Sequence, residues 1–471
     1  MAELKLANTI AKERVADLAQ RNGEPSWLQD LRNAAWEIYF QSPMPTTRDD
    51  DWRKTEIDNI DLSTFITVDP IKSKAVKTPS IELLNSALAK LDEPAGVYVD
   101  DYASQTQYAT VNAELAKQGV IFLPLTEAIE KHPDLVKKIF ENGKPLTSDD
   151  KFTLMNKALF NSGLLLYVPK NVVVDAPFVS AVNLPEAAKG QPAGSNGQAV
   201  FPRIVVVAEA NSQVTLVNAF ANSAVAVASA NPEAKGSQSD KKETSGTILS
   251  NSFVEVTVGQ GAKVTVMAVD KLSNAVFAVS RVRTHIHKDG VFNLTTAGLG
   301  GKQIKSDIET IMVEPGSHSD IRGVVLGDGS EHYSYNTIQE HTCPDTTSNI
   351  NFRVALKETS SSVYQGIVKV DQIAQRTNAF QSNKNLLLGT EARADSIPRL
   401  EILADDVKCS HGATVGPVDK EQLFYLNCRG LNTKEAEELI VRGFFVQILD
   451  GIEIKGAADW VGDLVAEKIY K

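Results

Sequence analysis

Apolar residues in the first third of the chain recur at helical spacing. Leu6, Ile10 and Leu18 share one face of a segment that is otherwise charged. Further helical patterns cover residues 26–39, 81–91, 125–131, 134–140 and 152–162. Together they predict a mainly helical domain at 1–165, interrupted by strand-like segments such as Gly96–Val99.

The middle of the chain changes to short β-branched segments separated by small polar turns. Ile204–Val207 and Phe253–Val258 are examples of the segments, and Gly259–Gly261 and Lys288–Gly290 of the turns. Most turns follow one another at about thirty residues, with room for two strands in each interval. This quasi-period favours a β-solenoid over 166–428, in which each coil buries its apolar side on its neighbours. A β-sandwich is the competing interpretation, and the lack of long helices excludes a βαβ array.

Two segments inside the β region are low in bulky apolar residues. Residues 187–197 are rich in Gly, Ala, Pro and Ser, and residues 230–246 are polar, so both are predicted to be mobile surface loops. Helical patterns return at 429–471. Asn432 and Glu435 have the spacing of a capping box, and an amphipathic stripe follows Trp460.

Composition indicates a large folded protein. The chain has 471 residues, a length typical of about three domains. Of these residues 42% are hydrophobic and 23% are charged, which is enough apolar material for a large core. The 59 acidic and 48 basic side chains give a net charge of −11. This balance argues against a nucleic-acid-binding protein, which needs a basic face, and against a polybasic membrane anchor.

The chain shows no export signal and no run of about 18 apolar residues that could span a membrane. Its three cysteines are Cys343, Cys409 and Cys428. They cannot form a disulfide framework or a self-contained zinc or iron–sulfur site, because they contain no close pair. We therefore expect a reducing cytoplasm.

The segment Ala404–Thr414 contains the densest group of reactive side chains. If it is a strand, Cys409 and His411 point to the same face, about 6.5 Å apart along it. They could form a nucleophile–base pair or provide two metal ligands. The structural alternative is a buried thiol that packs as a small apolar group beside a hydrogen-bonded histidine.

Other candidates are weaker. His285 and His287 share a strand face, and a multi-histidine metal site with His318, His332 and His341 is conceivable, but neighbouring arginines would repel a cation. Cys343 and Cys428 are isolated, which favours packing roles. The chain has no phosphate-binding P-loop and no Gly-x-Ser-x-Gly elbow.

A long C-terminal stretch resembles a known family. The segments 364–370, 374–377, 383–388, 398–402, 405–416, 421–426 and 429–430, with Trp52–Thr55 far upstream, are similar to the SufB/SufD subunits of the SUF iron–sulfur cluster assembly scaffold. SufB subunits carry a functional cysteine directly after the glutamate that matches Glu401, where this chain has Ile402. They also usually have His-Glu-Ala-Thr, where this chain has His411–Thr414. Both differences favour the SufD branch over a SufB-like paralogue.

The resemblance implies a mainly β protein with a right-handed parallel β-helix between an N-terminal and a C-terminal helical domain. It implies a non-catalytic scaffold subunit that pairs with SufB through the β-helix, or with itself when isolated, and binds the ATPase SufC through residues 429–471. A nascent iron–sulfur cluster would form at the SufB–SufD interface, with His411 as a ligand, Cys409 as a weaker candidate and a SufB cysteine as the thiolate. Flavin has been associated with such complexes, but no flavin or nucleotide motif occurs in this chain.

One position departs from the family. Where a Gly-Gly-x-x-x-Arg-x-Asp pattern is frequent, this chain has Lys305, which keeps the charge but loses the bidentate fork of arginine. Two other functions stay open from the residues alone. They are a Cys–His hydrolase or transferase that uses Cys409 and His411, with Asp405 or Asp406, and a structural β-solenoid adhesin.

Overall fold

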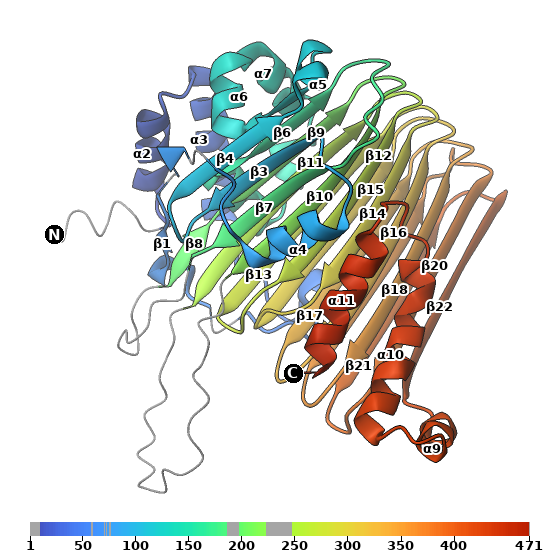
Figure 1. Cartoon of the computed structure of the whole chain (residues 1–471). Helices are drawn as coiled ribbons and strands as arrows, with labels where there is room; N and C mark the ends of the chain where they lie inside the picture. The colour runs from blue at the N-terminus through green and yellow to red at the C-terminus, as the bar shows by residue number, and fades with distance from the viewer. Residues whose placement is uncertain are drawn as a thin grey trace, which may run out of the picture.

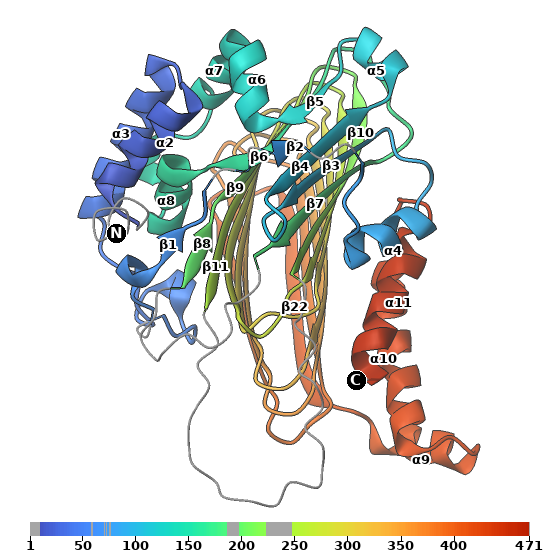
Figure 2. The same ribbon diagram turned by 60° about the vertical axis from the view of Figure 1, so that its left-hand side comes forward.

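The computed structural model describes residues 10–57, 60–69, 71, 73–74, 77–185, 197–222 and 247–470. Two long, mostly parallel β-sheets stack face to face, with helices on the outer side of each (Figures 1 and 2). From β11 onward the chain alternates between the sheets, so each coil adds one strand to each sheet. The protein is therefore mainly β, and its core is a parallel β-solenoid, as predicted.

The strand register confirms the quasi-period. Lys263 pairs with Val291, 28 residues further along, and Val291 pairs with His318 after another 27. Sheet A contains β6 (Ser162–Val168), β9 (Pro202–Ala208), β11 (Ile248–Val258), β13 (Val276–Ile286), β15 (Gln303–Met312), β17 (His332–His341), β19 (Ser361–Val370) and β21 (Arg393–Ile402), with β8 (Gln198–Val200) beside β11. Sheet B contains β7 (Phe178–Leu184), β10 (Gln213–Asn222), β12 (Lys263–Lys271), β14 (Val291–Gly298), β16 (His318–Gly327), β18 (Thr347–Leu356), β20 (Thr377–Leu387) and β22 (Val407–Pro417).

Short strands from the N-terminal part extend both sheets at their first end. β5 (Ile121–Pro124) pairs antiparallel with β6 of sheet A. In sheet B, β3 (Gly96–Asp101) pairs with β7, β4 (Thr106–Val111) pairs antiparallel with β3, and β2 (Ser73–Lys74) pairs with β4. β1 (Ile66–Thr67) pairs with β8. The strand-like segment predicted at 96–99 is β3. These added strands close the first end of the solenoid.

Alternate residues of each strand fill the space between the sheets with a largely apolar core. Polar side chains interrupt this core along one row, where Ser252, Ser280 and Ser306 pair in register. Aromatic side chains fill the later coils: the Phe352 ring lies 5.3 Å from that of Tyr335 and 5.1 Å from that of Tyr364, between ring centroids. Aromatic pairs also occur at the first end, where the Phe122 and Phe178 ring centroids lie 4.6 Å apart.

N-terminal helices cover the outer face of sheet A. The helical elements of the N-terminal part are α2 (Lys12–Asn22), α3 (Ser26–Gln41), α4 (Glu82–Lys90), α5 (Ala113–Lys117), α6 (Leu125–Lys131), α7 (Pro133–Glu141) and α8 (Lys151–Leu159), with 3₁₀ turns at Asp50–Trp52, Leu62–Thr64 and Leu146–Ser148. Leu249, Phe277 and Val279 of the sheet pack in one cluster with α2, α3, α6, α7 and α8, whereas α4 packs on the side of sheet B. The predicted helical segments are thus present.

Buried ion pairs fix the start of α8 on sheet A. Arg283 of β13 donates hydrogen bonds to Glu309 Oε2 at 2.6 Å and to Asp149 Oδ1 at 2.7 Å. Burial alone would raise the pKa of Glu309, but the charge of Arg283 and the hydrogen bond from Lys144 outweigh it and lower that pKa to about 2. Because such pairs are costly unless their geometry is exact, they specify one placement of the helix.

Residues 50–57 form a strap across the outer face of sheet A. Side-chain amides of three successive strands of this sheet hold it: Gln303, Asn336 and Gln365 donate to backbone carbonyls of the strap at 2.8–3.1 Å. The strap reaches the last strand, where Arg399 pairs with Asp50 at 3.1 Å. It thereby ties the N-terminal domain to the far end of the solenoid.

C-terminal helices cover the outer face of sheet B (Figure 1). The covering helices are α10 (Thr433–Leu449) and α11 (Ala457–Tyr470), and the shorter α9 (Lys420–Cys428) precedes them without a buried side chain. The predicted capping box at Asn432 and Glu435 starts α10. α10 lies against β16 and β18, and α11 packs on α4 from the N-terminal part. α9 already begins at Lys420, ahead of the helical tail predicted from 429.

The mobile loops predicted at 187–197 and 230–246 lie, apart from Gly197, outside the described residues. Every helix among the described residues is too short or too polar to cross a bilayer.

The carboxyl group of Asp270 in β12 allows a test of how apolar the space between the two sheets is. Val264 and Val266 of this strand lie in the inter-sheet core, so the alternation places Asp270 on the same side. Burial raises the pKa of Asp270 to about 7. The folded state thus favours the neutral acid, and its contribution to stability is lost as the pH rises from about 4 to about 7. Asp270→Asn should therefore raise the free energy of unfolding, measured by denaturant titration, by at least about 1 kcal/mol at pH 8.

The gain from Asp270→Asn should grow between about pH 4 and pH 7 and then level off. The exposed Asp175→Asn serves as the matched control and should leave the pH profile unchanged. An equal gain at pH 4 and pH 8 would contradict the assignment of Asp270 to the apolar interior.

Candidate functional site

The last coil of the solenoid is open. Among the residues that the structure describes, β21 pairs only with β19, and β22 only with β20, so each is the edge strand of its sheet. Along β22 almost every residue is exposed or half-buried, whereas the strands of the middle coils are largely buried. This end therefore leaves unpaired backbone groups and the inner face of the solenoid accessible.

Cys409 and His411 both lie on β22, as the sequence predicts for a strand. Cys409 packs against a small cluster that includes Val368, Val370 and Ala379, so it faces the interior. His411 is two residues further along and therefore points to the same side. It pairs in register with Gln381 of β20. The open end thus presents the histidine on the inner face of the last coil.

The two side chains differ in accessibility. Cys409 is half-buried, and burial raises the pKa of its thiol despite a hydrogen bond from the backbone of Ala379 that lowers it. His411 is exposed, and within the described residues it has no hydrogen bond or ion pair. The imidazole is therefore accessible to a ligand from outside, whereas the thiol behaves as a packed group.

Gln381 lies behind His411 and was missed in the sequence. Its side chain is 1% exposed and crosses the interior towards β19. A Cβ at Gly366 would lie 1.8 Å from its Nε2 atom, so only glycine leaves room for it. The quasi-period would have identified Gln381, because it precedes His411 by thirty residues.

Apolar side chains surround the open end. Ile373 and Leu403 are 68% and 67% exposed in the turns after β19 and β21, again thirty residues apart. Phe380 of β20 and Val415 of β22 are also exposed. Large apolar side chains in otherwise polar turns indicate a contact surface.

The histidines considered as a metal site do not converge. His341 faces the interior and bonds to Thr346 and Ser348, while His332 lies on the outer face beside Thr55 of the strap. His285 is on the outer face of β13, where burial lowers its pKa to about 4. No group of three or more His, Cys, Asp or Glu side chains suited to a metal occurs in the part of the chain that the structure describes.

The remaining cysteines lie away from the open end's inner face. Cys343 is buried, and burial raises the pKa of its thiol to about 11. Cys428 is exposed at the end of α9. Asp405 and Asp406, suggested as partners of a Cys–His pair, are exposed in the turn before β22. All three cysteines are free thiols.

Lys305 lies on the outer face of sheet A. It is fully buried beneath the strap, with its Nζ 5.5 Å from the centroid of the Trp52 ring and an ion pair to Asp307. The position that departs from the family pattern therefore supports the strap rather than the open end.

The C-terminal helices carry a second apolar surface. Phe424 and Tyr425 of α9 and Leu439 and Val446 of α10 are exposed, although the opposite side of α10 is buried on sheet B. Figure 2 shows α9 projecting away from the solenoid. This surface faces away from the sheet that anchors the helices.

Comparison with known proteins gives the family. Residues 191–444 match the model described as SUF system FeS cluster assembly, SufBD core domain, and residues 13–179 match the SufBD protein N-terminal region. The chain is 31% identical to the iron–sulfur cluster assembly protein SufD of Bacillus subtilis, over 98% of each chain. It is 25% identical to SufBD family proteins of Staphylococcus epidermidis and Staphylococcus aureus, over 92% of this chain and 88% of theirs.

The core model covers more than half of the chain, and the SufD relative is matched along nearly its whole length. These matches confirm the resemblance drawn from the motifs and connect the chain with SUF iron–sulfur cluster assembly. The chain belongs to the SufBD family.

Proposed function

We propose that this chain is a non-catalytic scaffold subunit of a SUF complex that pairs with a SufB-type subunit and the ATPase SufC in a reducing cytoplasm. The observation that carries the proposal is the open last coil, which leaves two edge strands, an apolar rim and His411 accessible together. An edge of this kind promotes aggregation unless a partner covers it.

A second solenoid of the same family is the partner that fits. Only another pair of sheet edges at the same separation can satisfy β21 and β22 at once. The rim formed by Ile373, Leu403 and Val415 then becomes the apolar core of the interface. In the absence of SufB, a second copy of this chain offers the same edges, and a homodimer is expected.

The chemistry at this interface suits a shared cluster. Iron–sulfur clusters are held chiefly by thiolates, and histidine replaces cysteine on one iron in Rieske centres. His411 provides an accessible imidazole, and the partner's cysteine provides the thiolate that Ile402 does not. Cys409 supports the strand and is the weaker candidate, because its thiol is packed against apolar side chains. The nascent cluster is cargo of the complex.

The ATPase would dock on α9 and the exposed side of α10. Arg353 of β18 donates to the Phe444 carbonyl of α10 at 2.8 Å, which links that helix to sheet B. A movement of α10 on ATP binding would thus act on the coils next to the open end. We assign nucleotide binding to that partner, and flavin, where present, to the assembled complex.

A Cys–His hydrolase is the second candidate function. It needs a thiolate of depressed pKa at Cys409, whereas burial shifts the pKa of that thiol upwards. The direction of this shift favours the scaffold.

His411→Ala tests the cluster site. In the complex co-expressed with SufB-type and ATPase subunits, we expect anaerobic reconstitution to give a much weaker iron–sulfur absorption than wild type, because one ligand is lost. Ser410→Ala, on the opposite face of the same strand, is the control and should be unaffected. Wild-type cluster content in the alanine variant would exclude His411 as a ligand.

Leu403→Asp tests the pairing. A charge in the rim should reduce recovery of the SufB-type partner in a pull-down by about fivefold or more, since a desolvated carboxylate has no partner there. Phe40→Asp makes the same change at an exposed site on α3, far from the open end, and should have no effect. Equal recovery with both variants would place the interface elsewhere.

Alkylation rates distinguish the scaffold from the hydrolase. With iodoacetamide at pH 7.5, we expect Cys428 to react first, Cys409 about tenfold more slowly and Cys343 slowest, in the order of their burial. Mass spectrometry of tryptic peptides follows each site, and Cys428→Ser should abolish the fast phase. Fastest labelling at Cys409 would favour the hydrolase.

A further inference from the structure

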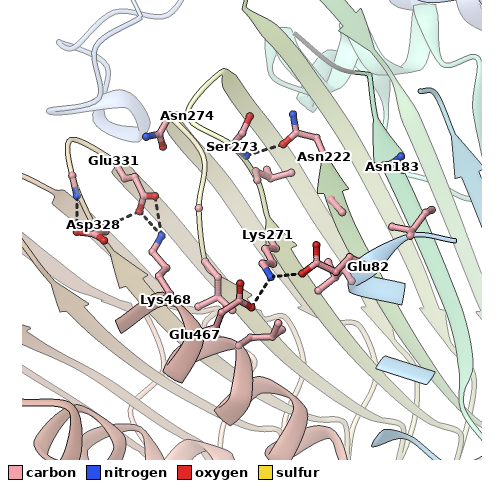
Figure 3. A pocket seen from close by; sticks show the side chains of 18 of the residues that line it. Glu82, Asn183, Asn222, Lys271, Ser273, Asn274, Asp328, Glu331, Glu467 and Lys468 are labelled. Atoms are coloured by element: carbon pink, nitrogen blue, oxygen red, sulfur yellow. Dashed lines mark hydrogen bonds and ion pairs between the residues drawn. The ribbon is translucent and has the colours of Figure 1, made fainter. Parts of the chain in front are cut away.

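A cavity of about 470 Å³ lies where the C-terminal helix meets the solenoid, away from the open end. It is open to solvent on one side and is lined by the start of α4, by α11 and by the turns that follow β10, β12, β14, β16 and β18. Figure 3 shows its side chains. Apolar walls come from Ile81, Leu83, Leu272, Leu299 and Leu464. A space of this size suits a small organic molecule rather than a bare ion.

The cavity has charged groups on both sides. On one side, Lys468 of α11 is bound by Glu331 at 2.6 Å, with Asp328 close by. On the other side, Lys271 of β12 pairs with Glu467 at 2.7 Å and with Glu82 at 3.7 Å. Each lysine is thus already matched by a carboxylate.

The lining as a whole is acidic. It contains five carboxylates, those of Glu82, Asp328, Glu331, Glu358 and Glu467, against two lysines. Glu358 is exposed and has no ion pair among the described residues. The excess negative charge disfavours phosphates and favours cationic ligands.

A buried acceptor provides a second, independent observation. Asn183 lines the cavity and is only 5% exposed. Its Nδ2 atom donates to Asp101 Oδ1 at 2.7 Å, which fixes the orientation of the amide, since the carboxylate accepts only. Its Oδ1 atom is buried without a partner. An unsatisfied buried acceptor is costly, and a donor from a ligand would satisfy it.

We propose that this cavity binds an aliphatic polyamine. Ammonium groups would bind Glu82 and Asn183 Oδ1 on one side and Glu358 on the other, since Asp328 already pairs with Lys357 at 3.3 Å. The methylene chain would lie against the leucine walls. Because α4 belongs to the N-terminal part and α11 to the C-terminal helices, the ligand would also join these two elements.

Isothermal titration of the full chain with spermidine at low ionic strength tests the proposal. We expect saturable binding of one spermidine molecule per chain and weaker binding of putrescine. Mg²⁺, added at the same total concentration of positive charge, should not bind. The double variant Glu82→Gln, Glu358→Gln should lower the affinity for spermidine by about tenfold, because two charge-assisted contacts are lost. Both side chains are exposed, so the fold should persist.

Glu93→Gln with Glu391→Gln is the matched control. Both residues are exposed and lie outside the cavity, and this variant has the same change in net charge. It should bind spermidine like wild type. The proposal is overturned if spermidine gives no saturable heat, if both double variants lose affinity equally, or if a flavin nucleotide displaces bound spermidine.

Discussion

Parallel strand pairing is the constraint on which the molecule depends. A parallel strand cannot bond to the strand that follows it through a tight turn, so each coil needs another coil beside it. At the first end the chain meets this need itself, because β5 closes sheet A and β3, β4 and β2 extend sheet B. At the last end nothing in the described chain continues β21 and β22. Within the described chain, the solenoid therefore has one end covered by added strands and one open end.

The two outer faces are attached to their helices by different forces. Sheet A holds the N-terminal domain through buried ion pairs such as Arg283–Asp149 and through the amides that bind the strap. Such contacts tolerate only one geometry. Sheet B holds α10 and α11 through a large apolar cluster, to which contacts such as Arg353 to the Phe444 carbonyl and the Lys271–Glu467 ion pair are added. Apolar packing is less directional, so the C-terminal helices are the element better suited to move on the solenoid.

The coil length and the histidine could be predicted, but the strap and the cavity could not. The turns recur at near-constant spacing because each coil repeats the same contacts, and that regularity is visible in the sequence. The role of Lys305 depends on Trp52, which is more than 250 residues away in the chain, and no local pattern shows such a contact. The cavity likewise combines Glu82 with Lys468. Gln381 was missed but could have been predicted, since the thirty-residue period places it beside His411.

The small number of cysteines can be understood from the open last coil. A chain with three separated cysteines cannot ligate a cluster alone, and the structure leaves Cys343 buried and Cys409 packed. Among the Cys and His side chains that the structure describes, His411 alone combines exposure with a position on the inner face of the last coil. A single neutral imidazole binds iron weakly without thiolates. In the proposed function, another chain brings its thiolate ligand to the edge where His411 lies, and the same chain pairs with the backbone of β21 and β22. That proposal thus completes the ligand set and the two strand edges at the same place.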